Sequence, residues 1–138
     1  MEPAQASASE QKESNGQKSI LLVEDDDALA NVYLIRLQAE GFDVHRVSNG
    51  EDALATALKY NPDLVLLDIM MPKVSGFDVL DILRNTPGTS YVKIIMLTAL
   101  GQESDIARAK ALGVNDYLVK SQVVIADVVG RIRKQLET

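Results

Sequence analysis

The stretch PDLVLLD, residues 62–68, decides how this chain folds. Its middle residues, 64–67, are all apolar, and Asp68 follows them at once. A run that is apolar at every position is typical of a strand covered by helices on both faces. Similar runs rich in Val, Ile and Leu recur, each followed by polar residues and a segment with helical spacing; they are residues 20–23, 42–47, 92–97 and 117–119. The sequence therefore predicts an α/β fold of alternating strands and helices.

The run at residues 42–47 differs from the others because apolar and polar residues alternate along it. Alternation is typical of an edge strand with one wetter face. Five βα units with such an edge strand match a flavodoxin-like (βα)5 fold, a doubly wound parallel sheet with strand order 2-1-3-4-5. In sheets of this kind, ligands bind beyond the carboxyl ends of the strands, at the switch point between strands one and three.

Helical spacing is found between the predicted strands and after the last one. The first helix is expected to end at Gly41 through a left-handed cap, and the second at residues 61–62, Asn-Pro. The third is expected to end before the Thr-Pro-Gly turn at residues 86–88. The segment near residues 102–112 is built mainly from Ala, so we expect it to be the least firmly held helix. The last helix, residues 125–136, is strongly amphipathic.

The composition describes one ordinary globular domain and excludes several classes of protein. The chain has 138 residues, 46% of them hydrophobic, a formal net charge of −6 and no Cys. Without Cys there is no disulfide, no thiolate metal site and no cysteine nucleophile. The acidic balance argues against direct binding of nucleic acid, and no apolar run approaches the roughly 18 to 20 residues that span a membrane. No signal-peptide pattern precedes Ile20, so a cytoplasmic setting is expected.

Two further features are expected to be structural rather than functional. Residues 1–18 are mostly Ala, Ser, Gln, Glu, Asn and Gly, which predicts a disordered tail or a cloning remnant, with one domain over residues 19–138. His45 is the only histidine and lies on the predicted edge strand, so we expect neither a metal ligand nor a phosphohistidine there.

Acidic residues gather where the first and third predicted strands end. Glu24 and Asp25 follow the first strand, and Asp68 follows the third. Unpaired carboxylates this close together would raise one another's pKa and destabilise the fold, so a divalent cation is the natural remedy. An all-oxygen cluster without thiols suits Mg²⁺. Asp26 or Asp27 is expected to cap the helix that follows.

The same edge of the sheet is predicted to carry a hydroxyl group and an ammonium group. Thr98 follows the fourth strand, and Lys120 follows the fifth. A carboxylate nucleophile beside Mg²⁺, an ammonium group and a hydroxyl is suited to accepting a phosphoryl group, because the cations spread the transferred charge and the hydroxyl hydrogen-bonds the product.

These residues fall within motifs that resemble a known family. The motifs are ILLVEDD at residues 20–26, PDLVLLDIMMP at residues 62–72 with Gly76 shortly after, LTA at residues 97–99 and GVNDYLVK at residues 113–120. In combination, order and spacing they resemble the receiver domains of two-component response regulators. The resemblance runs from Ser19 to near the C-terminus.

The resemblance implies a role for each residue of the predicted site. Asp68 would receive a phosphoryl group from a phosphohistidine on a sensor histidine kinase or phosphotransfer protein. Glu24, Asp25, Asp68 and the backbone carbonyl of Met70 would hold Mg²⁺, and Lys120 would contact the phosphoryl group. The chain would then be a phosphoacceptor that catalyses its own phosphotransfer and slow autodephosphorylation, not a turnover enzyme.

The resemblance also implies how phosphorylation is read out. Thr98 would follow the phosphoryl group inward, and Tyr117 would rotate with it as an aromatic switch. The face formed by residues 102–112, 117–119 and 125–136 would then change and be recognised by a downstream effector protein. A phosphorylation-dependent homodimer is an option within the family, whereas direct contact with nucleic acid or membrane is not expected. Because the last predicted helix lies near the end of the chain, no output domain is expected, and the sequence leaves open whether the domain acts alone or was excised from a longer protein.

Some positions give the sequence individual features within the family. Members differ in autodephosphorylation according to the residues two beyond the acceptor Asp and two beyond the Thr, here Met70 and Leu100. Neither side chain can orient a water by hydrogen bonding, so slow hydrolysis is expected. Ser121 stands where the family usually has Pro after the Lys, often with a cis bond. A cis bond before a non-proline residue costs about 2.5 to 4 kcal/mol, so a trans or strained junction is expected.

Three other functions are alternatives to phosphotransfer. A flavodoxin-like electron carrier needs an anion-cradling loop after the first strand, and the acidic residues 24–27 would repel a flavin phosphate. A Mg²⁺-dependent aspartyl phosphatase usually needs a second Asp close to the nucleophile, but Ile69 and Met70 follow Asp68. A phosphorylation-independent interaction module, or pseudo-receiver, is the remaining alternative because of Ser121.

Overall fold

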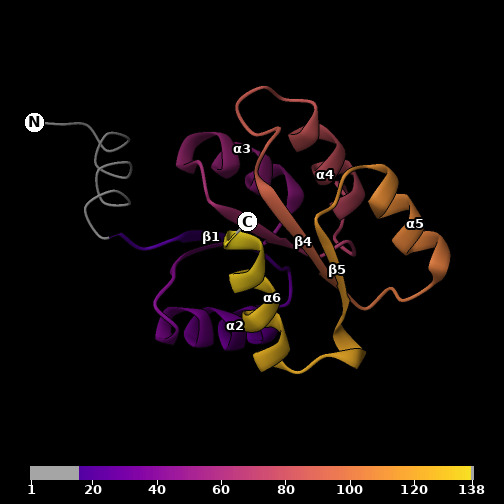
Figure 1. The fold of residues 1–138 in the computed structure, drawn as a ribbon. Helices are drawn as coiled ribbons and strands as arrows, with labels where there is room; N and C mark the ends of the chain where they lie inside the picture. The colour runs from indigo at the N-terminus through magenta and orange to yellow at the C-terminus, as the bar shows by residue number, and fades with distance from the viewer. Residues whose placement is uncertain (1–15, 138) are drawn as a thin grey trace, which may run out of the picture.

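A computed structural model of the chain describes residues 16–137. The strands are β1 (Ser19–Val23), β2 (Asp43–Val47), β3 (Leu64–Leu67), β4 (Lys93–Thr98) and β5 (Asp116–Val119). The helices are α2 (Asp27–Ala39), α3 (Gly50–Tyr60), α4 (Gly76–Arg84), α5 (Glu103–Ala111) and α6 (Ile125–Leu136), with a 3₁₀ turn η1 (Lys120–Gln122) before α6. The strands and helices alternate along the chain as predicted (Figure 1).

The strands form one parallel sheet in the order β2-β1-β3-β4-β5. Strand β1 lies between β2 and β3, with Val23 level with both Val47 and Leu67. Because the strands are parallel, their carboxyl ends meet at one edge of the sheet. The predicted flavodoxin-like fold and the edge position of β2 are confirmed.

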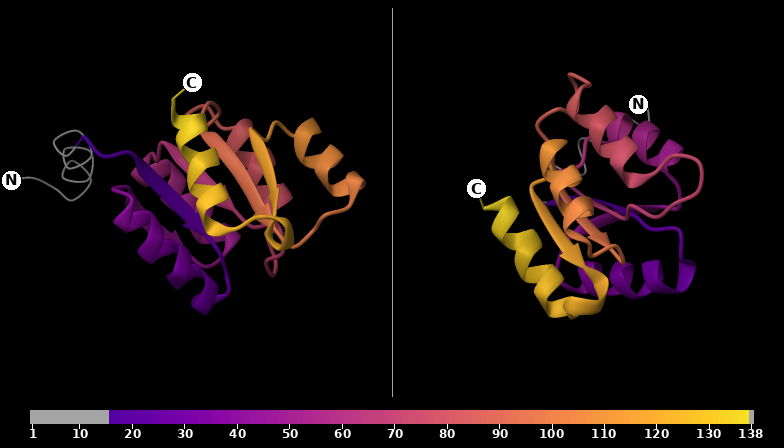
Figure 2. Two further views of the ribbon diagram at one scale, coloured as in Figure 1. Left: turned by 60° about the horizontal axis from the view of Figure 1, so that its bottom comes forward. Right: turned by 90° about the vertical axis from the view of Figure 1, so that its right-hand side faces the viewer.

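Helices cover both faces of the sheet, so the inner strands are buried from both sides. Helices α2 and α6 pack on one face, and α3, α4 and α5 pack on the other (Figure 2). Alternate residues of one strand enter different cores: Leu21 and Val23 face α3 and α4, whereas Ile20 and Leu22 face α2 and α6. This two-sided burial explains why residues 20–23 of β1 and residues 64–67 of β3 are apolar at every position.

The predicted helix ends are found in the structure. Asp26 caps α2, where its carboxylate accepts a hydrogen bond of 3.0 Å from the Leu29 amide. Gly41 follows α2 with a φ of 96°, and Asn61 ends α3 in the left-handed region with a φ of 53°. Ser75, for which no cap was predicted, begins α4 with a capping box to Asp78.

Helix α5 is held by few buried side chains. Ala109 is its only fully buried residue, and Ile106 is half-buried. By contrast, α6 buries Val128, Val129 and Ile132. The expectation that the helix near residues 102–112 is the least firmly anchored agrees with this difference.

Some expectations concern parts of the chain away from the sheet edge. Most of the predicted tail, residues 1–18, lies outside the described residues. Within residues 16–137, no helix has the length and apolar character to span a membrane. His45 is exposed on β2, and its ring centroid lies 5.0 Å from that of Tyr60.

Candidate phosphoacceptor site

Three acidic side chains converge because β1 and β3 are neighbours that end at the same level. Val23 pairs with Leu67, so Glu24 and Asp68 leave the sheet side by side. The Asp68 amide donates to the Val23 carbonyl at 3.1 Å, which extends the ladder by one residue. The structure therefore places the predicted acceptor beside the acidic loop that follows β1.

The carboxylates of Glu24, Asp25 and Asp68 form a group that could hold a metal ion. Carboxylate oxygens from all three residues lie within 4.8 Å of one another. Glu24 and Asp68 are buried, with 3% and 4% of their surface exposed, whereas Asp25 is exposed. Among the described residues, the Asp25 carboxylate has no hydrogen-bond donor or cation as a partner, so it is available as a ligand. This oxygen-only donor set fits the preference of Mg²⁺.

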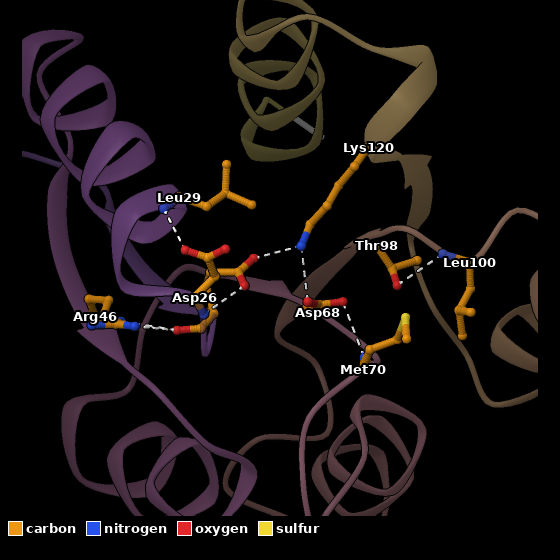
Figure 3. A network of polar contacts seen from close by, with 9 residues as sticks. Asp26, Leu29, Arg46, Asp68, Met70, Thr98, Leu100 and Lys120 are labelled. Atoms are coloured by element: carbon orange, nitrogen blue, oxygen red, sulfur yellow. Dashed lines mark hydrogen bonds and ion pairs between the residues drawn. The ribbon is translucent and has the colours of Figure 1, made fainter.

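Lys120 reaches into the site from the end of β5 and joins the two buried carboxylates (Figure 3). Its Nζ atom lies 2.8 Å from Glu24 Oε1 and 3.0 Å from Asp68 Oδ2. Glu24 is held further by the Asp26 amide, which donates to Oε2 at 3.1 Å. The ammonium group thus neutralises part of the charge that the carboxylates bring together.

The pKa values of Glu24 and Lys120 are both raised, and the two shifts have opposite consequences for charge. Burial raises the pKa of Glu24, and the hydrogen bond from Lys120 only partly offsets this. For Lys120, burial acts to lower the pKa, but the hydrogen bonds and charges of Glu24 and Asp68 outweigh it and the pKa is raised. A raised pKa on Glu24 favours a neutral carboxyl, whereas a raised pKa on Lys120 favours the ammonium form. The short contacts from one Nζ to two carboxylates support the charged pair.

Thr98 and Tyr117 are linked through the backbone of Leu100. Thr98 is fully buried at the end of β4, and its hydroxyl accepts a hydrogen bond of 3.4 Å from the Leu100 amide. The Tyr117 hydroxyl donates to the Leu100 carbonyl at 2.7 Å. Burial, together with the charges of Asp105 and Asp68, raises the pKa of Tyr117, so its hydroxyl keeps its proton for this bond. A single peptide segment therefore contacts both predicted switch residues.

Met70 and the loop after β3 cover one side of Asp68. The Met70 amide donates to Asp68 Oδ1 at 3.2 Å, while the Met70 side chain is 53% exposed. Leu100 is half-buried on the other side of Thr98. Met70 and Leu100 both lie beside the site, near Asp68 and Thr98 respectively (Figure 3).

Two residues of the site have roles that were not predicted. A Cβ atom at Gly76 would lie 2.3 Å from the Asp68 carbonyl oxygen, so only glycine allows the loop to fold back on the acceptor. The motif at residues 62–72 with Gly76 shortly after does not by itself indicate this close approach. Arg46 on β2 donates to the Glu24 carbonyl, and nothing in the sequence pattern around it indicated this contact.

The chain continues from Lys120 to Ser121 without a cis peptide bond. No peptide bond between the described residues is cis, so the one between Lys120 and Ser121 is trans. The chain instead enters the 3₁₀ turn η1. Lys120 still reaches both carboxylates, so replacement of the usual Pro by Ser121 leaves the ammonium group in the site.

A flavodoxin-like sheet with this set of groups at its carboxyl edge defines a class of signalling domain, and comparison with known proteins identifies the family. A family model of the response regulator receiver domain matches residues 20–132. The chain belongs to this family.

Curated relatives match over most of this chain. The DNA-binding dual master transcriptional regulator RpaA of Synechocystis is 38% identical over 117 residues, which cover 85% of this chain and 48% of the relative. The phosphate regulon transcriptional regulatory protein PhoB of Rhizobium meliloti is 44% identical over 101 residues, 73% of this chain and 44% of the relative. The chain therefore spans about half the length of the curated relatives it matches.

Solved structures share the same fold over nearly their whole length. A response regulator from Chloroflexus aurantiacus has a TM-score of 0.83 and 32% identity, covering 88% of this chain and 99% of that one. The BeF3-activated N-terminal receiver domain of RstA from Klebsiella pneumoniae has a TM-score of 0.81 and 30% identity, covering 88% and 100%. The predicted family and fold are confirmed together.

Proposed function

We propose that this domain accepts a phosphoryl group on Asp68 in a Mg²⁺-dependent reaction and transmits the change through the face formed by α5, β5 and α6. The observation that carries the proposal is the placement of Asp68. It is buried between the acidic loop after β1 and the Lys120 ammonium group, 3.0 Å from Nζ. A carboxylate so placed has the charge partners that phosphoryl transfer needs.

The reaction is a displacement at phosphorus by a carboxylate oxygen. One oxygen of Asp68 attacks the phosphorus of a phosphohistidine, the P–N bond breaks, and the imidazole leaves with the electron pair and takes up a proton. Glu24, Asp25, Asp68 and the Met70 carbonyl would hold Mg²⁺, which would supply charge neutralisation to the transferring group. Lys120 exchanges part of its contact with Asp68 for the new phosphoryl oxygens.

The readout begins at Thr98, whose hydroxyl turns toward the phosphoryl group. Turning removes the 3.4 Å hydrogen bond that the Leu100 amide makes to this hydroxyl. Leu100 also holds the Tyr117 hydroxyl through its carbonyl, so a shift of Leu100 frees the ring to rotate. Helix α5 follows directly and is weakly anchored, so the shift favours a second arrangement of this face.

The phosphoryl donor is proposed to be a sensor histidine kinase or a phosphotransfer protein, and the receiver of the signal an effector protein. The RpaA and PhoB relatives are a DNA-binding and a transcriptional regulator, but this chain covers under half of each. With a net charge of −6 the chain is poorly suited to bind nucleic acid directly.

The test is the intact mass of the protein after incubation with acetyl phosphate. Wild type with Mg²⁺ should gain one phosphoryl group, and the gain should vanish in Asp68→Ala or when Mg²⁺ is chelated. Asp63→Ala is the matched control, because Asp63 is a carboxylate at the opposite end of β3, hydrogen-bonded to Ser19 at 2.7 Å. No gain in wild type, with Mg²⁺ still bound, would favour the phosphorylation-independent pseudo-receiver instead.

A further inference from the structure

We infer that Arg46 is a positioning residue that holds the loop after β1 in the shape needed to bind Mg²⁺. The inference rests on the proposed function, because it concerns the same metal site. Arg46 does not belong to the acidic cluster. It lies on the edge strand β2 and contacts the loop from outside (Figure 3).

The guanidinium group of Arg46 makes contacts at two points of the loop. Its Nε and Nη2 atoms donate to the Glu24 carbonyl at 3.1 Å and 2.6 Å. Nη2 also lies 2.9 Å from Asp27 Oδ1. We call this set of contacts from Nε and Nη2 the fork. The Arg46 side chain is only 23% exposed, so the fork is partly shielded from water.

These two points lie on either side of Asp25. The Glu24 amide is already fixed by the Val47 carbonyl at 3.2 Å. Because Arg46 binds the Glu24 carbonyl, both backbone polar groups of Glu24 are hydrogen-bonded to residues of β2. Arg46 also pairs with Asp27, two residues beyond Asp25. The Asp25 carboxylate has no other partner among the described residues, so the backbone alone orients it.

Arg46 could instead act only through its charge, and the two roles predict opposite effects on Mg²⁺. A positive charge near the site repels a divalent cation, so removal of the charge alone would tighten binding. Loss of the fork would loosen the loop and weaken binding. Residues that orient metal ligands without touching the metal typically contribute tenfold to a hundredfold to affinity.

The experiment measures the affinity of the full chain for Mg²⁺ by calorimetric titration in four proteins. Arg46→Met keeps much of the aliphatic stem without the charge, and Arg46→Lys keeps the charge without the fork. Arg36→Met is the matched control, because Arg36 pairs with Glu40 at 2.9 Å at the far end of α2. We expect both Arg46 variants to bind Mg²⁺ about tenfold more weakly, and Arg36→Met to bind as wild type does.

A second measurement separates positioning from general loss of stability. The Asp26 amide is hydrogen-bonded to Glu24 Oε2, so its hydrogen exchange without Mg²⁺ should speed up in both Arg46 variants while the exchange of strand amides in β3 and β4 stays unchanged. Equal acceleration of all amides would indicate a merely structural role and would overturn the inference.

The other possible results of the Mg²⁺ titration also test the inference. Wild-type affinity in Arg46→Lys, or tighter binding by Arg46→Met, would show that only the charge matters and would overturn the positioning role. If wild type itself bound no Mg²⁺, the proposed function would fail, and the inference would fail with it for that separate and visible reason.

Discussion

At the strand ends, two buried carboxylates share a single ammonium group. Glu24 and Asp68 both contact Lys120 Nζ, and each is almost fully removed from solvent. Buried charges persist only when paired in this way, and removal of one partner leaves the other uncompensated. Lys120 therefore has a stabilising role at rest besides the proposed contact with a phosphoryl group.

The pH dependence of stability should reveal this pairing. The pKa of Lys120 is raised above 10.5 in the fold, so its contribution is fully present below pH 10.5 and is lost as pH rises through the higher folded value. We compare urea unfolding of wild type and Lys120→Met at about pH 9 and about pH 12. The free energy of unfolding of wild type relative to the variant should fall over this interval. A difference that is constant or grows with pH would contradict the pairing.

The residue at position 70 should set how long the phosphorylated state lasts. An Asn side chain can hydrogen-bond an attacking water, whereas Met cannot. Met70→Asn should therefore lose phosphate faster by on the order of tenfold, about 1.4 kcal/mol in activation free energy. Decay of the phosphorylated mass with time measures this rate. Met70→Leu is the apolar control and should decay as slowly as wild type; an Asn variant that is equally slow would contradict the assignment.

Among the elements, α5 should be the most mobile helix. It buries only Ala109, whereas α4 buries Phe77 and Leu80 among others and α6 buries Val128, Val129 and Ile132. Amides in the centre of α5 should exchange hydrogen faster than those of α6 by on the order of tenfold, or about 1.4 kcal/mol in opening free energy. Hydrogen exchange followed by mass spectrometry resolves the two helices. Equal protection would mean that α5 is not the element poised to move.

The elements were predictable because each is encoded locally. The apolar runs predicted the strands. The cap residues Asp26, Gly41 and Asn61 predicted helix ends that the structure confirms. The site residues Glu24 and Asp68 could be brought together from the strand order alone, since β1 and β3 are adjacent. Their roles in phosphoryl transfer stay predictions.

Contacts between distant segments could not be predicted in the same way. The fork from Arg46 to Glu24 joins residues 22 positions apart, and its geometry depends on the register of β1 with β2. The close approach of Gly76 to Asp68 depends on the path of the loop after β3. The Leu100 bridge between Thr98 and Tyr117 uses backbone atoms, which carry no sequence signal.

At the scale of the whole molecule, Mg²⁺ should stabilise the fold because it relieves repulsion within an acidic chain of net charge −6. At ten times its dissociation constant, a ligand that binds only the folded state adds about 1.4 kcal/mol to the free energy of unfolding. For a domain of this size the midpoint of thermal unfolding should rise by about 5 °C, followed by circular dichroism. Asp25→Asn removes the exposed ligand and should abolish the rise. A rise of the same size in both proteins would place the stabilising ion elsewhere.

The central claim is that a change at Asp68 reaches the face formed by α5, β5 and α6. The most direct measurement is a two-dimensional amide NMR spectrum recorded with Mg²⁺, before and after addition of the phosphoryl mimic beryllofluoride. We expect shift changes that extend from Asp68 through Thr98 and Leu100 into α5 and to Tyr117, and no changes in Asp68→Ala. Changes confined to the residues that touch Asp68, with α5 and Tyr117 unmoved, would contradict it.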